Sequence, residues 1–247
     1  GWRFKLYLEK NIIDEFYLNE KKYFKKPKYT SLILLNLIKN FYKKNDKKTF
    51  LDVGCANGAV IAFIKNKFKN INYIGTDVEL RFKKNLSKIG KDVKFYYDDI
   101  KKKNKQKIFG DIVYCSGVLS LFNDPKLLLR GLIDRSKSGS KIIVSSMMNP
   151  HDLDVIIKFR NNSSKQIFFD GEGWNLHSIF QISKILKKSK RVKSFKFIKT
   201  KFPKNLKIKQ NKKDQLRSWT VKFNNELLFM NGLCVIQHHY FLIINIK

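Results

Sequence analysis

The sequence predicts a three-layer α/β/α fold around a mostly parallel β-sheet, and two observations lead to this prediction. Between residues 49 and 146, short runs rich in β-branched and aromatic residues alternate with longer segments of helical periodicity. A glycine-rich turn also joins the first of these runs to the segment that follows it. Because strand–helix–strand units form right-handed crossovers, their strands lie parallel in a sheet that helices cover on both faces.

Length and composition agree with a globular domain. The chain has 247 residues, and 43% of them are hydrophobic. A chain of this size buries a sizeable core without disulfides or a structural metal. We expect a single domain with three parts: an N-terminal helical cap over 1–48, a core over 49–146, and an insertion with C-terminal strands over 147–247.

The elements of the first half follow from hydrophobic patterning. A helix is expected from an N-cap at Thr30 or Ser31 to about residue 43. A turn at Ser138-Gly139-Ser140 is expected to precede the last core strand. The core strands are expected at 49–53, 72–76, 93–97, 111–115 and 141–146, and the helices at 59–68, 78–89 and within 125–134.

The pattern is looser in the second half of the chain. Residues 151–175 are expected to form an inserted loop with one short helix. A β-hairpin is expected around a turn at Asn224-Asn225. The remaining expected elements are a helix at 176–188, a strand at 192–199, the hairpin strands at 219–223 and 227–230, and a final strand at 240–246.

The formal net charge of +32 points to an anionic partner such as nucleic acid, anionic lipid or a phosphorylated substrate. Only seven of the 52 basic residues are arginines, however, although arginine is the usual reader of phosphate. An excess of Lys, Asn, Ile and Phe is typical of an AT-rich genome. We therefore weigh genome bias above nucleic-acid binding, and interpret the lysine runs at 101–107, 187–193 and 204–213 as solvated surface.

Cysteine usage and hydropathy indicate the compartment. The three cysteines lie far apart and form no Cys-x-x-Cys pair, so neither a zinc site nor a disulfide framework is indicated. No apolar run approaches the ~18–20 residues that span a bilayer. We recognise no signal peptide and expect a cytoplasmic protein without a membrane span.

The turn after the first core strand carries the strongest motif. Its sequence is Asp52-Val53-Gly54-Cys55-Ala56-Asn57-Gly58. Glycine allows a strand to turn sharply into a helix while its backbone approaches a ligand closely. The motif resembles the first motif of class I S-adenosylmethionine (SAM)-dependent methyltransferases. The resemblance implies that the helix N-terminus binds the methionine carboxylate and that Asp52 faces the ammonium group.

Three later strand ends support the resemblance. Asp77 follows Gly54 by 23 residues and ends the second strand, where an acid accepts hydrogen bonds from both ribose hydroxyls. By resemblance, Asp99 binds the adenine amino group and Ile100 packs on the ring. The segment around Ser116 resembles the family's fourth motif. The residues assigned to the cofactor S-adenosyl-L-methionine are Asp52, Gly54, Cys55, Ala56, Gly58, Asp77, Val78, Asp98, Asp99, Ile100 and Ser116.

The resemblance covers residues 49–146 well and the rest loosely. It implies a Rossmann-like sheet of seven strands, the last antiparallel beside the fifth, to which the hairpin is added. A nicotinamide dehydrogenase is the nearest rival, but its Gly-x-Gly-x-x-Gly fingerprint would place glycine at Ala56. The residues assigned to the cofactor also have structural alternatives. Asp77 could only cap a helix, and Asp98-Asp99 could only form a solvated turn.

A histidine near the fifth strand is the candidate catalytic residue on the side of the methyl acceptor. Methyl transfer needs alignment of the nucleophile, and some hydroxyl acceptors are also activated by a general base. We assign this role to His177, with Trp174 as a wall of its pocket. In the structural alternative, His177 and Ser178 only cap the following helix. His151 is a weaker candidate, and we assign structural roles to His238, His239, Arg217, Trp219, Asn231 and Gly232.

The absence of two known motifs excludes some classes of methyl acceptor. Cys115-Ser116-Gly117-Val118 stands where enzymes that methylate base amines carry an Asn/Asp-Pro-Pro-Tyr/Phe motif, and no proline precedes a cysteine as in pyrimidine C5 enzymes. We therefore expect a small-molecule or glycan-type acceptor, methylated at oxygen. The alternative is RNA, methylated at a 2′-OH or ring position. A second alternative is a SAM-binding protein without catalysis, because residues 116–121 contain no acid or base.

Overall fold

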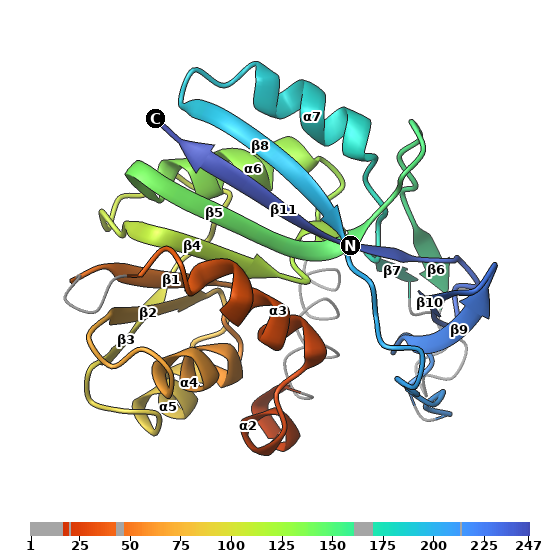
Figure 1. The fold of residues 1–247 in the computed structure, drawn as a ribbon, viewed down its shortest axis with the longest axis horizontal. Helices are drawn as coiled ribbons and strands as arrows, with labels where there is room; N and C mark the ends of the chain where they lie inside the picture. Colours follow the sequence, from red (N-terminus) through yellow and green to blue (C-terminus); the bar gives the residue numbers. More distant parts are fainter. Residues whose placement is uncertain (1–16, 20, 43–46, 161–169, 213) are drawn as a thin grey trace.

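The computed structural model describes residues 17–19, 21–42, 47–160, 170–212 and 214–247. A seven-stranded sheet with the order β3-β2-β1-β4-β5-β11-β8 forms its centre (Figure 1). The strands are β1 (Thr49–Val53), β2 (Asn72–Asp77), β3 (Val93–Tyr97), β4 (Gly110–Ser116), β5 (Ser136–Met148), β8 (Val192–Lys199) and β11 (His238–Ile246). The predicted α/β class is confirmed.

The pairing of the strands confirms the expected topology. β1 pairs in parallel with β2 and β4, β2 with β3, and β4 with β5. β11 is antiparallel to both β5 and β8, so the last strand lies beside the fifth as expected. The carboxyl ends of β1 to β5 and of β8 therefore meet the start of β11 at one edge of the sheet.

Helices cover both faces of the sheet (Figure 1). One face packs against α3 (Tyr29–Ile38), α4 (Ala59–Lys65) and α5 (Phe82–Ser87), with Leu34, Ile61 and Phe82 among the buried contacts. The other face packs against α6 (Pro125–Asp134) and α7 (Ile179–Lys187), through Leu128 and Ile182. A short helix α2 (Lys22–Lys25) and a 3₁₀ turn (Leu119–Leu121) complete the described helices. None of the helices in these described residues has the length and hydropathy required to cross a bilayer.

Several boundaries differ from the predictions. α3 ends at Ile38 and starts without a side-chain cap, because Lys28 and not Thr30 or Ser31 precedes it. α5 starts only at Phe82. β5 begins at Ser136, so the expected turn at residues 138–140 lies within this strand. Gly139 has φ +72° there, and the register with β4 shifts nearby, which indicates a bulge.

The second half contains two small antiparallel ribbons. β6 (Lys158–Arg160) pairs with β7 (Asp170–Glu172), and residues 151–160 and 170–175 contain no helix, so the expected short helix is not found in them. β9 (Trp219–Phe223) and β10 (Glu226–Met230) form the predicted hairpin. Asn224 and Asn225 both have positive φ, as a tight two-residue hairpin turn requires.

Candidate functional site

The predicted motif residues meet at the carboxyl edge of the sheet. Asp52 is the last but one residue of β1, Asp77 ends β2, and Ser116 ends β4. Asp98 and Asp99 directly follow β3. Because open α/β sheets bind ligands at this edge, the strand order creates one candidate site.

The glycine loop folds back onto the end of β2. The backbone N–H groups of Gly54 and Cys55 both donate to the carbonyl of Thr76, at 2.8 and 3.0 Å. Gly54 has φ +72°, and a Cβ added there would lie 2.5 Å from Cγ2 of Val118. The turn conformation and the close packing of Val118 thus require glycine at this position.

Asp52 is the most unusual charge of the site. Its side chain is 3% exposed, and no described residue forms a hydrogen bond or ion pair with its carboxylate. Burial, and secondarily the nearby Asp77, raise the pKa of Asp52 to about 8. A buried carboxylate without a partner is costly. This position is therefore suited to a cationic group from a ligand.

Asp77 is held in a fixed orientation by the loop. Its two carboxylate oxygens accept the backbone N–H groups of Ala56 and Glu79, both at 3.0 Å. Burial raises the pKa of Asp77, although these N–H groups oppose the shift. Asp77 does not cap a helix, because α5 begins only at Phe82. No basic side chain in the described residues pairs with it.

Apolar side chains stand exposed beside these carboxylates. Val78 is 48% exposed, Leu80 59% and Tyr97 46%, and all three lie at or just after the ends of β2 and β3. Exposed apolar residues gathered at one place mark a ligand or partner site. A flat base with a ribose matches this combination of apolar surface and acceptor oxygens.

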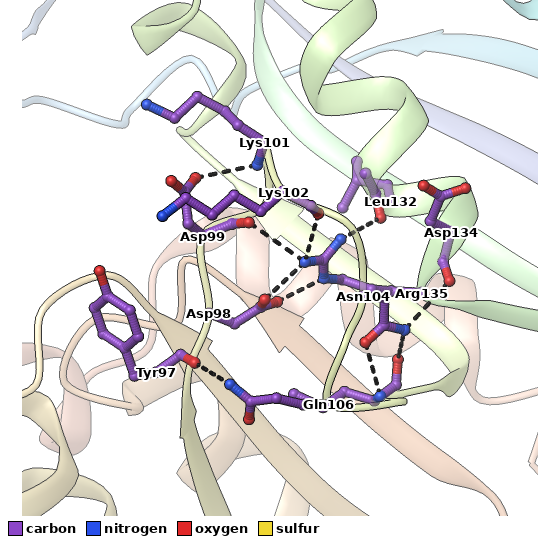
Figure 2. A network of polar contacts seen from close by, with 12 residues as sticks. Tyr97, Asp98, Asp99, Lys101, Lys102, Asn104, Gln106, Leu132, Asp134 and Arg135 are labelled. Carbon is purple, nitrogen blue, oxygen red and sulfur yellow. Dashed lines mark hydrogen bonds and ion pairs between the residues drawn. The ribbon is translucent and has the colours of Figure 1, made fainter.

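Asp98 is engaged elsewhere. Its carboxylate accepts the Nε–H of Arg135 at 2.5 Å and an Nη2–H at 2.7 Å (Figure 2). Arg135, which follows α6, is 0% exposed. The expected cofactor contact of Asp98 is thus replaced by a buried, bidentate ion pair. A basic residue at the C-terminal end of a helix has an ordinary explanation in the helix dipole, so nothing in the sequence marks Arg135.

Asp99 and Ile100 differ in their surroundings. Asp99 is half-buried, and its carboxylate accepts the N–H of Lys101 at 3.1 Å (Figure 2). Ile100 is 7% exposed and belongs to the apolar cluster beneath α6. The expected packing of Ile100 on an adenine ring is thus not supported, because its side chain lies in the core.

The fourth strand ends in a loop of small residues. The N–H of Gly117 donates to the carbonyl of Ser145 at 2.9 Å, and half-buried Ser116, at the end of β4, is paired with Ser145 of β5. Cys55 and Cys115 are buried nearby, and burial raises the pKa of both thiols far above the usual range. These thiols are therefore packing residues and not nucleophiles.

His177 does not have the surroundings of a general base. Its side chain is 0% exposed, and its Nε2 lies 2.7 Å from the carbonyl of Phe122. Burial lowers its pKa. Ser178 caps α7 by accepting the N–H of Phe180 at 3.1 Å. The geometry favours the structural alternative for both residues, and Trp174 packs edge-on against Phe159.

All four histidines nevertheless gather at the carboxyl end of β5. His151 follows this end and is exposed, and the carbonyl of His177 accepts the N–H of Asn149 at 2.9 Å. His238 and His239 pair with Met148 and Met147 across β11. Their exposure differs, since His238 is half-buried and His239 is 9% exposed.

His239 is the centre of a buried hydrogen-bonded group. Its Nδ1 lies 2.7 Å from Oγ1 of Thr200, and its Nε2 lies 3.1 Å from Oγ of Ser145. Burial lowers the pKa of His239 to about 4, so the ring stays neutral. One ring nitrogen then donates and the other accepts. His239 is the second residue of β11, which agrees with the expected place of His238 and His239 at the edge of the last strands.

These contacts continue to the cofactor motif. The Tyr114 hydroxyl lies beside those of Ser116 and Ser145. Tyr114 is also the neighbour of Asp52 in the register of β1 and β4. We call the whole set the polar row; it consists of Asp52, Tyr114, Ser116, Ser145, His239 and Thr200. The sequence does not reveal this row, because only the strand order brings β1, β4, β5, β11 and β8 side by side.

The hairpin residues have structural contacts. Arg217 forms an ion pair with Asp214 at 3.0 Å. Asn231 is 0% exposed, and its side-chain amide donates to the carbonyl of Leu216 at 3.3 Å. Both contacts agree with a structural role, which stays a prediction for these residues.

The chain is similar in sequence to known methyltransferases. The family described as "Methyltransferase domain" matches residues 26–189, which is more than half of the chain. Protein 235L of Invertebrate iridescent virus 6, which is named as a methyltransferase, is 27% identical over 123 residues, and the match covers 49% of this chain. It covers 46% of the viral protein, so the chain spans less than half the length of this relative.

Solved structures share the fold. The PH0226 protein of Pyrococcus horikoshii OT3 has a TM-score of 0.57 and 13% identity, with 99% of this chain and 100% of that chain covered. The N-methyltransferase NodS of Bradyrhizobium japonicum WM9, crystallised with S-adenosyl-L-homocysteine, has a TM-score of 0.53 and 12% identity, with 98% of both chains covered. Coclaurine N-methyltransferase, also bound to that product, has a TM-score of 0.51 and 13% identity over 68% of this chain and 50% of its own.

The family match, the sheet order and the placement of the acidic strand ends agree with one another. At these identities the solved structures show the fold, while the match over residues 26–189 shows the family. The chain belongs to the class I SAM-dependent methyltransferases, whose cofactor is S-adenosyl-L-methionine.

Proposed function

We propose that this chain transfers the methyl group of S-adenosyl-L-methionine to a small-molecule or glycan-type acceptor, at oxygen. One observation carries the cofactor part of the proposal: Asp52 is buried at the carboxyl edge, with a pKa of about 8 and no cationic partner among the described residues. The ammonium group of the methionine moiety supplies such a cation. When bound, the cofactor supplies a methyl group already activated on a sulfonium.

The other residues of this edge have matching roles. Asp77, fixed by two backbone N–H groups, accepts the ribose hydroxyls. Exposed Val78 covers one side of the adenine, and Asp99 accepts its amino group. The backbone of the glycine loop, from Gly54 to Gly58, encloses the methionine part together with Ser116.

The chemistry of the polar row supports a hydroxyl acceptor. Beyond Asp52 it contains hydroxyl groups and the neutral imidazole of His239, and no further carboxylate. Neutral donors and acceptors match a neutral hydroxyl, whereas an amine that binds as an ammonium ion needs a negative charge nearby and must lose a proton before it accepts the methyl group. No general base is assigned, since His177 is buried and hydrogen-bonded.

Calorimetric titration with S-adenosylhomocysteine tests the cofactor site. We expect the wild type to bind and Asp77→Ala to bind about tenfold more weakly or worse, which is about 1.4 kcal/mol. Asp92→Asn is the matched control, because Asp92 pairs with Lys65 away from the strand ends and should leave the affinity unchanged. A wild type that does not bind the ligand overturns the proposal. If it binds, an acceptor screen starting with sugars tests the rest, and binding without turnover on any acceptor favours a non-catalytic protein.

RNA remains the second candidate acceptor, and one observation favours it. Residues 173–213 contain 14 Lys or Arg and no Asp or Glu. Genome bias raises lysine but does not remove acids from one segment. RNA held by phosphate contacts loses affinity steeply with salt, with a log–log slope of about −0.7 per contact for single strands. Weak binding to tRNA or rRNA fragments that does not change with salt excludes this acceptor.

A further inference from the structure

We infer that Arg135 is a positioning residue that sets the selectivity of the cofactor site for adenine. The inference rests on the proposed function, because it concerns the nucleoside part of the same site. Arg135 contacts neither the strand-end carboxylates Asp52 and Asp77 nor the exposed apolar surface beside them. Its effect on a ligand is therefore exerted through the loop after β3.

Arg135 uses its whole guanidinium group inside the protein. Nε and Nη2 bind the carboxylate of Asp98, and Nη1 donates to the carbonyl of Gly131 at 3.1 Å. Nη2 also reaches the carbonyls of Asp99 and Lys102, both at 3.4 Å (Figure 2). The side chain thus connects the end of α6 to three successive points of one loop.

The loop has a second attachment to α6. A Cβ added at Gly131 would lie 2.2 Å from the carbonyl oxygen of Ile100, so this backbone already touches the helix. The loop also continues the nucleoside site directly, because the N–H of Asp98 donates to the carbonyl of Asp77 at 3.0 Å. A shift of Asp98 would therefore move the loop relative to the proposed ribose acceptor.

Asp99 depends on this arrangement. Its carboxylate has one contact that fixes its direction, the N–H of Lys101 at 3.1 Å. The backbone that carries Asp99 is held by Arg135 through the carbonyls of Asp99 and Lys102. Discrimination by hydrogen bonding requires an acceptor within a few tenths of an ångström of its place. Loss of the Arg135 contacts should consequently reduce the selectivity for the adenine amino group more than it reduces the overall affinity for the ligand.

Stability alone gives no reason for this pair. Buried ion pairs are often replaced by apolar residues of similar volume without loss of stability, whereas removal of one partner leaves an uncompensated charge. The double variant Arg135→Met/Asp98→Leu therefore removes the ion pair without leaving a buried charge. Arg135→Lys retains the charge but loses the fork that reaches Asp99 and Lys102.

The measurement is a ratio of two affinities for each protein. S-inosylhomocysteine has a carbonyl oxygen in place of the 6-amino group of S-adenosylhomocysteine and a proton on N1, so position 6 of the inosine ligand cannot donate to Asp99. We expect the wild type to prefer the adenosine ligand by about tenfold or more. In Arg135→Lys and in the double variant, the preference should fall to about threefold or less. Partial unfolding would lower the affinities for both ligands by the same factor and leave their ratio unchanged.

Arg191 provides the matched control. Its guanidinium holds the carbonyls of Ile133 and Ser136, both at 2.6 Å, at the same junction between α6 and β5 but without contact to the loop. Arg191→Lys should lower the melting temperature and retain the wild-type ratio. An unchanged ratio in both Arg135 variants overturns the inference. Failure of the wild type to bind either ligand overturns the proposed function instead, so the two results are distinct.

Discussion

At the scale of single residues, Asp52 makes cofactor binding dependent on protons. Its pKa of about 8 means that the carboxyl group is mostly protonated at neutral pH without ligand. A cationic ligand favours the carboxylate, so binding releases the proton. We predict that S-adenosylhomocysteine binding near pH 7 releases about one proton, and that the affinity rises toward about pH 9. Titration in buffers of different ionisation enthalpy measures the release, and Asp52→Asn should abolish it. Equal proton release in both proteins would contradict the assignment of Asp52.

His239 gives a second residue-scale prediction, for stability. Its folded pKa of about 4 lies below the ordinary value of 6.5, so the unfolded chain binds the proton more tightly. The stabilisation is therefore complete above the unfolded pKa and is lost as the pH falls toward the folded one. We predict that, between about pH 7.5 and about pH 4.5, the wild type loses about 2–3 kcal/mol more unfolding free energy than His239→Gln. Urea unfolding at both pH values tests this, and exposed His151→Gln should behave like the wild type.

The residues of the candidate site differ in how far the sequence alone could identify them. Asp52 and Asp77 could be placed because a strand end beside a glycine turn is a local pattern, readable from neighbours in the chain. Arg135 and His239 could not, because the partners that define them, Asp98 and Ser145, lie 37 and 94 residues away. His177 was singled out for its residue type, but its burial depends on packing that no local pattern shows.

At the scale of elements, α6 packs through Gly131 against the loop after β3. Alanine normally stabilises a helix relative to glycine by about 1 kcal/mol. At Gly131 we expect the reverse, because a Cβ would lie 2.2 Å from the backbone of Ile100. Gly131→Ala should destabilise the protein by about 1–3 kcal/mol and weaken S-adenosylhomocysteine binding. Thermal unfolding and calorimetry test this, with exposed Leu127→Ala on the same helix as control. A more stable variant with normal affinity would contradict the proposed role of the contact between α6 and the loop after β3.

The predicted elements also differ in accuracy for physical reasons. The strands at Thr49–Val53, Val93–Tyr97 and Val192–Lys199 have the predicted bounds, since apolar runs flanked by polar residues delimit them. α5 starts late because Asp77 accepts the N–H of Glu79 and forms a turn where periodicity predicts helix. Short-range polar contacts of this kind compete with helical hydrogen bonds and are invisible to hydrophobic patterning.

At the scale of the whole molecule, the net charge of +32 is the dominant feature, and self-repulsion at this charge opposes the compact state. Salt screens that repulsion, so the melting temperature should rise by a few degrees between about 20 mM and about 200 mM NaCl. A short RNA should have the opposite salt dependence, stabilising the protein only at low salt, if residues 173–213 bind phosphates. Replacing four exposed lysines of this segment, Lys187, Lys190, Lys193 and Lys196, with glutamate should abolish the effect of RNA but reduce only in part the effect of salt. If the RNA effect persists in that variant, the charge acts through the whole surface and the acid-free segment has no special role. If RNA has no effect on the wild type while salt still stabilises it, the charge reflects composition, and the search for the acceptor belongs among small molecules.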